Sequence, residues 1–218
     1  KPIEYLRAGV YWPGQDLPGL QDLPWCRELP SVMLTFYRAL VQAGNTHIID
    51  KLIKSLKQNQ LNIVPVYVTS FKDPLSDALL RDLVAVAKPD VVLNATGFSM
   101  NAPGAKISAS PFDTRDCPVF QLIFSGGTKA NWRAGTRGLS SRDIAMNVAL
   151  PEVDGRIITR AVSFKGLRTR DQLTQADIVE YTPVSDRCNF VAALAAAWSH
   201  LRRKPKSMRR VALIMANY

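Results

Sequence analysis

The chain has 218 residues, of which 47% are hydrophobic, and it carries a formal net charge of +10. This length and composition allow a sizeable buried core, which excludes a largely disordered protein. No run of about 18 apolar residues occurs, so no membrane-spanning helix is predicted, and no signal-peptide pattern is found at the start.

The cysteines Cys26, Cys117 and Cys188 lie far apart and form no C-x-x-C pair. An odd, scattered set indicates reduced, buried thiols in a cytoplasmic protein, not a disulfide framework or a zinc site. The 28 Lys and Arg exceed the 18 Asp and Glu. This excess favours acidic partners: a nucleic acid, or a small molecule with several carboxylates. The simpler explanation of the excess is that the basic side chains are solvated on the surface. No nucleic-acid recognition motif accompanies the charge, so no nucleic-acid partner is predicted.

Residues 1–30 are rich in proline and glycine, and they are predicted to form an irregular arm or linker. A regular pattern follows over residues 31–205. Helices are predicted after a cap at Asn45 or Thr46, and from Asp73-Pro74 to about Ala87. Apolar runs between turn signals predict buried strands at Val32–Tyr37, Ile63–Thr69, Asp90–Thr96 and Pro118–Phe124. This alternation predicts an α/β fold, with an open, mostly parallel sheet and flanking helices.

Asp154-Gly155 lies between the apolar stretches Val148–Leu150 and Arg156–Phe164. Because Asp-Gly is a strong turn signal between strands, we expect a hairpin insertion around residues 147–164. A helix is then predicted over Asp186–Arg203.

The chain ends in an apolar, strand-like run, RVALIMANY, which is similar in position to VMLTFY near the start. Residues 206–218 are therefore expected to be the first strand of a following α/β unit. Because the chain also starts with Lys1, we expect it to be a piece of a longer polypeptide.

Ligands of open parallel sheets bind beyond the carboxyl ends of the strands. Small and hydroxyl residues gather at those predicted ends, although ordinary strand-to-helix turns fit them equally well. The ends are Tyr37-Arg38, Thr69-Ser70, Thr96–Phe98 and Ser125–Thr128.

Known cofactor motifs are missing from the sequence. SGGTK at Ser125–Lys129 departs from the G-x-x-x-x-G-K-[ST] phosphate loop, and no G-x-G-x-x-G occurs, so no ATP or dinucleotide site is predicted. The two histidines show no metal-ligand spacing. The candidates for chemistry are Glu152 and Asp154. A structural role in the turn is enough to explain why an aspartate occurs at position 154. Glu152 follows Pro151 at the end of an apolar run, where a carboxylate can accept a proton or bind a hard cation.

Together, a series of ordered motifs over residues 31–218 resembles the large, tetrapyrrole-binding subunits of cobaltochelatases and magnesium chelatases. AGNT and SFKG favour the cobaltochelatase type. The motifs are FYR (Phe36–Arg38), AGNT (Ala43–Thr46), Trp132, RGLSSRD (Arg137–Asp143), NVALPEVDGRI (Asn147–Ile157), SFKG (Ser163–Gly166), DR (Asp186-Arg187), WSHLRRKP (Trp198–Pro205) and RRVALIMANY (Arg209–Tyr218).

The resemblance implies a segment of an ATP-dependent cobaltochelatase that inserts Co²⁺ into a corrin precursor, hydrogenobyrinic acid a,c-diamide. ATP is then hydrolysed by an AAA+ ATPase subunit with its companion subunit, in agreement with the missing phosphate loop. Two alternatives stay open. One is a magnesium chelatase subunit that acts on protoporphyrin. The other is a non-catalytic module that docks the AAA+ subunits.

Metal insertion exchanges two pyrrolic protons for a cation, so a base and an oxygen ligand are required. Under the resemblance, Glu152 is the candidate base and metal ligand, and Asp154 is the second catalytic candidate. Trp132 is a candidate to stack on the macrocycle. Arginines can bind the substrate's carboxylates in bidentate fashion, with a plain surface charge as the alternative for each. These candidates are Arg38, Arg137, Arg142 and Arg156.

Overall fold

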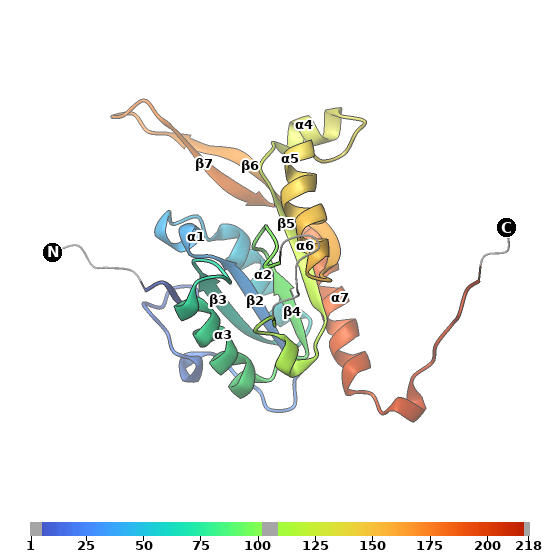
Figure 1. Cartoon of the computed structure of the whole chain (residues 1–218). Coiled ribbons are helices and arrows are strands. Elements are labelled where there is room, and N and C mark those ends of the chain that lie inside the picture. Colours follow the sequence, from blue (N-terminus) through green and yellow to red (C-terminus); the bar gives the residue numbers. More distant parts are fainter. Residues whose placement is uncertain (1–5, 102–108, 216–218) are drawn as a thin grey trace.

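The computed structural model describes residues 6–101 and 109–215, and its centre is a seven-stranded sheet (Figure 1). The strands lie in the order β1-β3-β2-β4-β5-β6-β7. The inner strands β3, β2, β4, β5 and β6 are parallel, whereas β1 and β7 pair antiparallel at the two edges. The predicted open, mostly parallel sheet is therefore confirmed. The bounds are β1 Ala8–Val10, β2 Ser31–Tyr37, β3 Asn62–Val68, β4 Val91–Asn94, β5 Val119–Ser125, β6 Ile157–Arg170 and β7 Asp177–Pro183.

Helices cover both faces of the sheet (Figure 1). On one face lie α2 (His47–Gln58) and α7 (Ser185–Arg203), whose apolar sides pack on β2, β4 and β5. On the other face lies α3 (Pro74–Ala87), which packs on β2 and β3. The Asp73 carboxylate begins α3 by accepting the Ser76 N–H at 3.0 Å, as its cap-and-proline pattern predicted.

The connection from β5 to β6 is helical, and it packs on the sheet through Val148 among others. It contains α4 (Lys129–Ala134) and then one unbroken helical stretch over residues 141–153. That stretch consists of α5 (Ser141–Ile144), a π-helical turn η3 (Ala145–Ala149) and α6 (Leu150–Val153). The remaining short helices are α1 (Arg38–Gln42), η1 (Leu20–Asp22), η2 (Asp113–Arg115) and η4 (Lys206–Met208).

The predicted hairpin around residues 147–164 is wrong, because its first half is this helix. The Ser140 hydroxyl begins the helix by accepting the Asp143 N–H at 3.1 Å. At the other end, the Gly155 N–H donates to the Glu152 carbonyl at 2.9 Å, and Gly155 has a φ of +70°. This left-handed conformation ends a helix and suits glycine. Asp154-Gly155 therefore terminates a helix instead of turning a hairpin.

The hairpin of this fold is formed by β6 and β7, which project away from the sheet (Figure 1). Its strands pair from Ser163 with Pro183 to Arg170 with Asp177. The Asp171 carboxylate organises the turn by accepting the N–H groups of Leu173 and Thr174. Most side chains beyond Phe164 on this ribbon are exposed.

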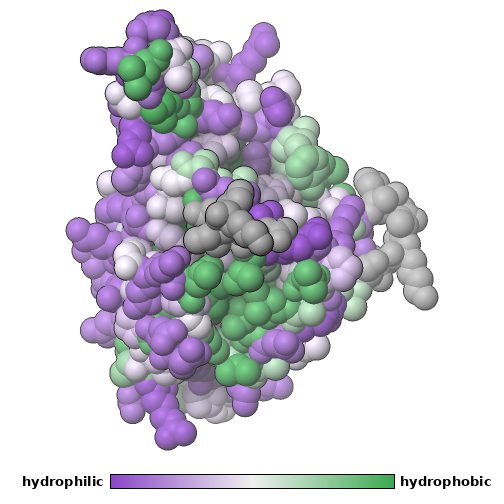
Figure 2. Space-filling view, turned by 90° about the vertical axis from the view of Figure 1, so that its left-hand side faces the viewer, coloured by the Kyte–Doolittle hydropathy of each residue, from purple (hydrophilic) through white to green (hydrophobic). Residues whose placement is uncertain are grey.

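Most of the described part of the arm is irregular, as predicted, but it also supplies the edge strand β1. Apolar side chains gather on the face that carries the arm and α3 (Figure 2). There Leu20, Trp25 and Val86 line a shallow hollow. Exposed apolar patches of this kind are typical of interaction surfaces.

Beyond η4, residues 209–215 form neither helix nor strand, and Val211 and Ile214 are about 90% exposed. The last three residues, 216–218, lie outside the described part of the chain. The strand expected at 206–218 as the start of a further α/β unit therefore stays a prediction. The division of the chain into three parts likewise stays a prediction.

Candidate functional site

Two neighbouring cavities lie at the carboxyl ends of the central strands, where the sequence analysis expected a ligand. The central cavity, of about 580 Å³, lies among β2, β5, the 141–153 helix and the base of the hairpin. The loop cavity, of about 380 Å³, lies beside it towards β3. The two share Tyr37, Gly97 and Phe98. The strand order reverses between β2 and β4, and this is where open α/β sheets place their ligands.

A row of polar side chains crosses the buried sheet just below these cavities. Thr35, Asn94 and Gln121 are register neighbours on β2, β4 and β5, and all three are 0% exposed. The Thr35 hydroxyl donates to the Asn94 Oδ1 at 2.8 Å, and the Asn94 Nδ2 donates to the Gln121 Oε1 at 2.8 Å. A buried polar network of this kind favours one strand arrangement because each partner must be satisfied.

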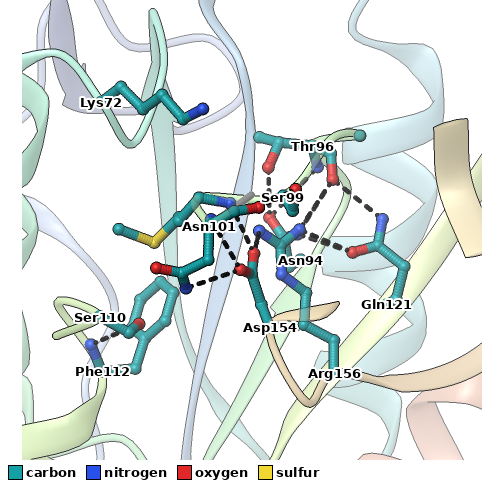
Figure 3. Close-up of polar contacts among 12 residues, drawn as sticks. Lys72, Asn94, Thr96, Ser99, Asn101, Ser110, Phe112, Gln121, Asp154 and Arg156 are labelled. Carbon is teal, nitrogen blue, oxygen red and sulfur yellow. Dashed lines mark hydrogen bonds and ion pairs between the residues drawn. The ribbon is translucent and has the colours of Figure 1, made fainter. Parts of the chain in front are cut away.

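Arg156 and Asp154 connect this row to the loop that follows β4 (Figure 3). The Arg156 guanidinium donates to the Gln121 Oε1 at 3.1 Å and to Asp154 at 2.7 Å. The Asp154 carboxylate also accepts the backbone N–H groups of Met100 at 2.8 Å and Asn101 at 3.1 Å. Burial lowers the pKa of Arg156, and the Asp154 carboxylate opposes that shift. Both side chains are buried, and their polar atoms bind other groups of the protein. This geometry fits a role in positioning the loop better than direct catalysis.

The 141–153 helix also holds the loop through a backbone contact. The Phe98 N–H donates to the Met146 carbonyl at 3.0 Å, in the π-helical turn. A β-carbon at Gly97 would lie 3.1 Å from that same carbonyl oxygen, closer than most such contacts, so the approach favours glycine. Pro151 has no N–H to donate into the preceding turn, which is consistent with an irregular helix here.

Glu152 lies on the outer side of this helix. Leu150 lines the loop cavity and Asp154 contacts the loop, whereas Glu152 is about 200° around the helix from Leu150. Its side chain is exposed and forms no hydrogen bond or ion pair with any residue that the structure describes. Glu152 is therefore a carboxylate without a side-chain partner in residues 6–101 and 109–215, and it lines neither cavity.

The lining of the central cavity combines two cationic side chains with apolar ones. Arg142 and Lys165 line it from the helix and from β6, and neither forms an ion pair within residues 6–101 and 109–215. Asp143, the one acidic residue among the described residues that line it, accepts hydrogen bonds from the Ser125 hydroxyl at 2.7 Å and the Gly126 N–H at 2.9 Å. Tyr181 also lines the cavity, and burial raises its pKa, so its hydroxyl remains a donor near neutral pH.

The other predicted site residues lie around this region. Arg38 begins α1 at the carboxyl end of β2 and is half-buried. Arg137 and Trp132 line a neighbouring cavity of about 300 Å³, which shares Asp143 with the central cavity. The Trp132 ring already contacts Arg187, at 4.4 Å, and Phe164, at 5.2 Å between ring centroids. Stacking on a macrocycle would therefore require the Arg187 guanidinium to move or the ligand to approach another part of the ring.

The described residues contain no group of three or more His, Cys, Asp or Glu side chains that could hold a metal ion. None of the helices in the described ranges combines the length and apolar character needed to cross a bilayer. The cysteines are unpaired: Cys188 is buried, as predicted, whereas Cys26 is exposed, contrary to the expectation of uniformly buried thiols.

Sequence reasoning missed several residues that shape this site, although the sequence carries signals for some. Thr35, Asn94 and Gln121 are polar residues within otherwise apolar strand runs, and such residues indicate a buried network. By contrast, Lys165 and Tyr181 belong to a ribbon whose pairing was not predicted, so no local pattern places them beside Arg142.

The whole chain, residues 1–218, matches the sequence model of the CobN/Magnesium Chelatase family. The aerobic cobaltochelatase subunit CobN of a Sinorhizobium species is 44% identical over 228 residues, covering 100% of this chain and 18% of that protein. CobN of Pseudomonas aeruginosa is 41% identical and covers 89% of this chain and 15% of that protein. A magnesium-chelatase subunit of Rhodobacter capsulatus is 24% identical and covers 100% of this chain and 19% of that protein.

A solved structure agrees with the fold. The catalytic subunit of cobaltochelatase from Mycobacterium tuberculosis superposes with a TM-score of 0.73 at 26% identity, covering 93% of this chain and 16% of that one. The chain thus spans less than a fifth of the length of each of these relatives. Because the family model covers every residue and a solved cobaltochelatase subunit shares the fold, the chain belongs to the CobN/magnesium chelatase family.

Proposed function

We propose that the chain is a segment of the tetrapyrrole-binding subunit of an ATP-dependent cobaltochelatase. This enzyme inserts Co²⁺ into hydrogenobyrinic acid a,c-diamide, in the cytoplasm, during cobalamin biosynthesis. The observation that carries the proposal is the 44% identity to a CobN subunit across the whole chain. The magnesium-chelatase subunit of Rhodobacter capsulatus reaches only 24%, which supports cobalt over magnesium.

Glu152 is proposed as the base that takes up a pyrrolic proton and as a transient oxygen ligand of the incoming Co²⁺. An exposed carboxylate without a described partner is free for both tasks. Because the described residues offer no metal cluster, the other ligands come from water, the tetrapyrrole nitrogens or other parts of the longer polypeptide. The outward direction of Glu152 supports a reaction centre between this segment and those other parts.

Asp154 is proposed to be a positioning residue, which holds Glu152 and the cavity wall in place. Its carboxylate joins the end of the helix that carries Glu152 to the N–H groups of Met100 and Asn101 in the cavity wall. Arg156 stabilises that carboxylate from the sheet side. The arginines Arg38, Arg137 and Arg142 keep their proposed role as contacts for substrate carboxylates, with Trp132 beside them.

ATP hydrolysis is proposed to occur on an AAA+ ATPase subunit and its companion. The glycine-rich loop after β5 supports this division, because its Gly126 N–H donates to the Asp143 carboxylate and is not free to bind a phosphate. A non-catalytic docking role is the second candidate. The apolar hollow on the arm and α3 favours it, since a patch of that kind is typical of protein contacts.

The experiment is metal insertion by the full-length polypeptide that contains this segment, reconstituted with its two partner subunits and ATP. Absorbance spectra follow Co²⁺ or Mg²⁺ entering the corrin precursor or protoporphyrin. The proposal predicts turnover with Co²⁺ and the corrin precursor. Turnover with Mg²⁺ and protoporphyrin alone would assign the magnesium alternative. Tight binding of the ATPase to the segment, with no tetrapyrrole binding by the full-length polypeptide, would assign the docking role.

A further inference from the structure

We propose that the central cavity is a binding site for a carboxylate attached to an apolar body, with Lys165 and Tyr181 joining Arg142 as its recognition groups. This inference rests on the proposed function only for the molecule that carries the carboxylate. It adds a location for the carboxylate and a role for Lys165, in the SFKG motif, and for Tyr181, which neither the motifs nor the comparisons assign.

Two positively charged side chains line the central cavity. Arg142 and Lys165 face one cavity from two different elements, and neither has an acidic partner among the described residues. Two cations that line one cavity make its potential more positive, which favours a bound anion. Asp143 offsets one of the two charges. Its oxygens already accept hydrogen bonds from Ser125 and Gly126, so it is fixed in the wall and cannot move to pair with both cations.

The donors around the cavity match the chemistry of a carboxylate. Arg142 offers a planar fork of N–H groups, and Lys165 a mobile ammonium whose Nζ lies 5.9 Å from the centre of the Tyr181 ring. The Tyr181 hydroxyl supplies a neutral donor that loses its proton only well above neutral pH. A carboxylate has two oxygens with about four acceptor positions, so these donors can all be used by one group.

Part of the cavity lining is apolar. Leu40, Phe124 and Met146 belong to it, and Phe98 lines both this cavity and the loop cavity. A volume of about 580 Å³ exceeds what one carboxylate needs and lies in the range of small-molecule sites. The combination therefore favours an acid with a hydrophobic body, such as one edge of a tetrapyrrole, over a small hydrophilic anion.

The site is separate from Glu152. The two residues Arg142 and Glu152 are ten positions apart along the helix, about 15 Å at 1.5 Å per residue, and Glu152 points to the other side. The cavity is thus expected to contribute to ligand affinity, whereas Glu152 is expected to contribute to the rate of metal exchange. A kinetic experiment can distinguish these two effects.

The direct test uses tryptophan quenching of the chain by deuteroporphyrin, which has two carboxylates, and by its uncharged dimethyl ester. The variant combines Arg142→Met with Lys165→Met, which keeps the apolar stems. We expect its affinity for the acid to fall at least about tenfold, the factor for one lost charged hydrogen bond, while the ester binds as before. The matched control is Lys54→Gln, which removes one exposed charge from α2 at a position that lines neither of the two cavities.

Competition with succinate distinguishes the source of the carboxylate. If succinate displaces the porphyrin acid from the wild type but does not bind the variant, the site is a carboxylate site that also accepts free acids. Equal losses for the acid and the ester, or no loss for either, would overturn the proposal. This binding experiment needs no metal insertion. A negative result would therefore leave the cobaltochelatase assignment intact, and a failure of that assignment would leave the carboxylate site intact.

Discussion

At the scale of single residues, the Asp154 carboxylate binds four groups, and this explains its burial. It accepts hydrogen bonds from two backbone N–H groups, from the Asn101 amide and from Arg156. A catalytic base requires a free lone pair and access to the substrate, and Asp154 has little of either. A carboxylate two positions from a proposed catalytic one can thus have a purely positional task.

Replacing Asp154 with alanine is expected to destabilise the fold by about 3–5 kcal/mol, because Arg156 is left as a buried charge without its partner. Adding Arg156→Met should recover part of this loss, since both charges are then removed. Urea unfolding measures both variants. The control is Asp177→Ala, whose partner Arg170 is exposed, and it should cost no more than about 1 kcal/mol. Equal costs for Asp154 and Asp177 would contradict this account of the buried pair.

The thiols are expected to differ in reactivity. Burial raises the pKa of Cys117 and Cys188 to about 11, whereas Cys26 is exposed. Since the thiolate is the reactive form, an aromatic disulfide reagent near pH 8 should modify Cys26 first and the other two slowly. The slow rates should rise as the pH approaches 11. All three should react quickly once the chain is unfolded in urea. Three equal rates in the folded chain would contradict the burial described.

At the scale of elements, the 141–153 helix organises the site. One side of it lines the two cavities, and its carboxyl end carries Glu152 outward. The Gly155 terminator is therefore expected to matter for stability. Alanine at Gly155 meets no atom within 4 Å, so its cost comes from the positive φ alone and should be about 1 kcal/mol.

Thermal unfolding checks this prediction. Gly155→Asn should cost less than alanine, because asparagine tolerates the left-handed conformation better. The control is Gly127→Ala, where φ is not left-handed and the nearest contact is an ordinary one of 3.6 Å. If the alanine variants at 155 and 127 were equally stable, the helix end would not depend on this conformation.

The elements also show what the sequence could predict. The inner strands were predictable because apolar runs such as Val32–Phe36 become buried strands, and α3 was predictable because Asp73-Pro74 begins it. The 141–153 helix was missed because Asp154-Gly155 serves equally well in a hairpin turn and at a helix end. Ser140 with Asp143 at the other end of the helix was the signal that separates the two.

The candidate site could be predicted only in part. The resemblance indicated which residues to consider, and the strand ends indicated the edge of the sheet where the two cavities lie. The separation of Glu152 from the cavities depends on the helix and its π-helical turn, which residue types alone do not determine. The pairing of Lys165 and Tyr181 with Arg142 depends on the β6–β7 ribbon. Strand β7 was missed because most of its side chains are exposed and it pairs only with β6.

At the scale of the whole molecule, the segment is one part of a much longer architecture in its relatives. Its described residues contribute a seven-stranded sheet with cavities at the carboxyl edge, a projecting ribbon, and an apolar hollow on the arm and α3. The excess of basic residues favours a ligand with several carboxylates. These surfaces agree with the proposal that the segment helps to hold a tetrapyrrole.

The most direct test of the central claim is the rate of Co²⁺ insertion by the full-length polypeptide with Glu152→Gln, assembled with its partner subunits and ATP. We expect the rate to fall by about 100-fold or more, since a general base is lost, while tetrapyrrole affinity stays within about twofold of the wild type. Glu28→Gln, just before β2 at the amino ends of the strands, is the control and should keep full activity. Wild-type turnover by the Glu152→Gln enzyme would contradict the account.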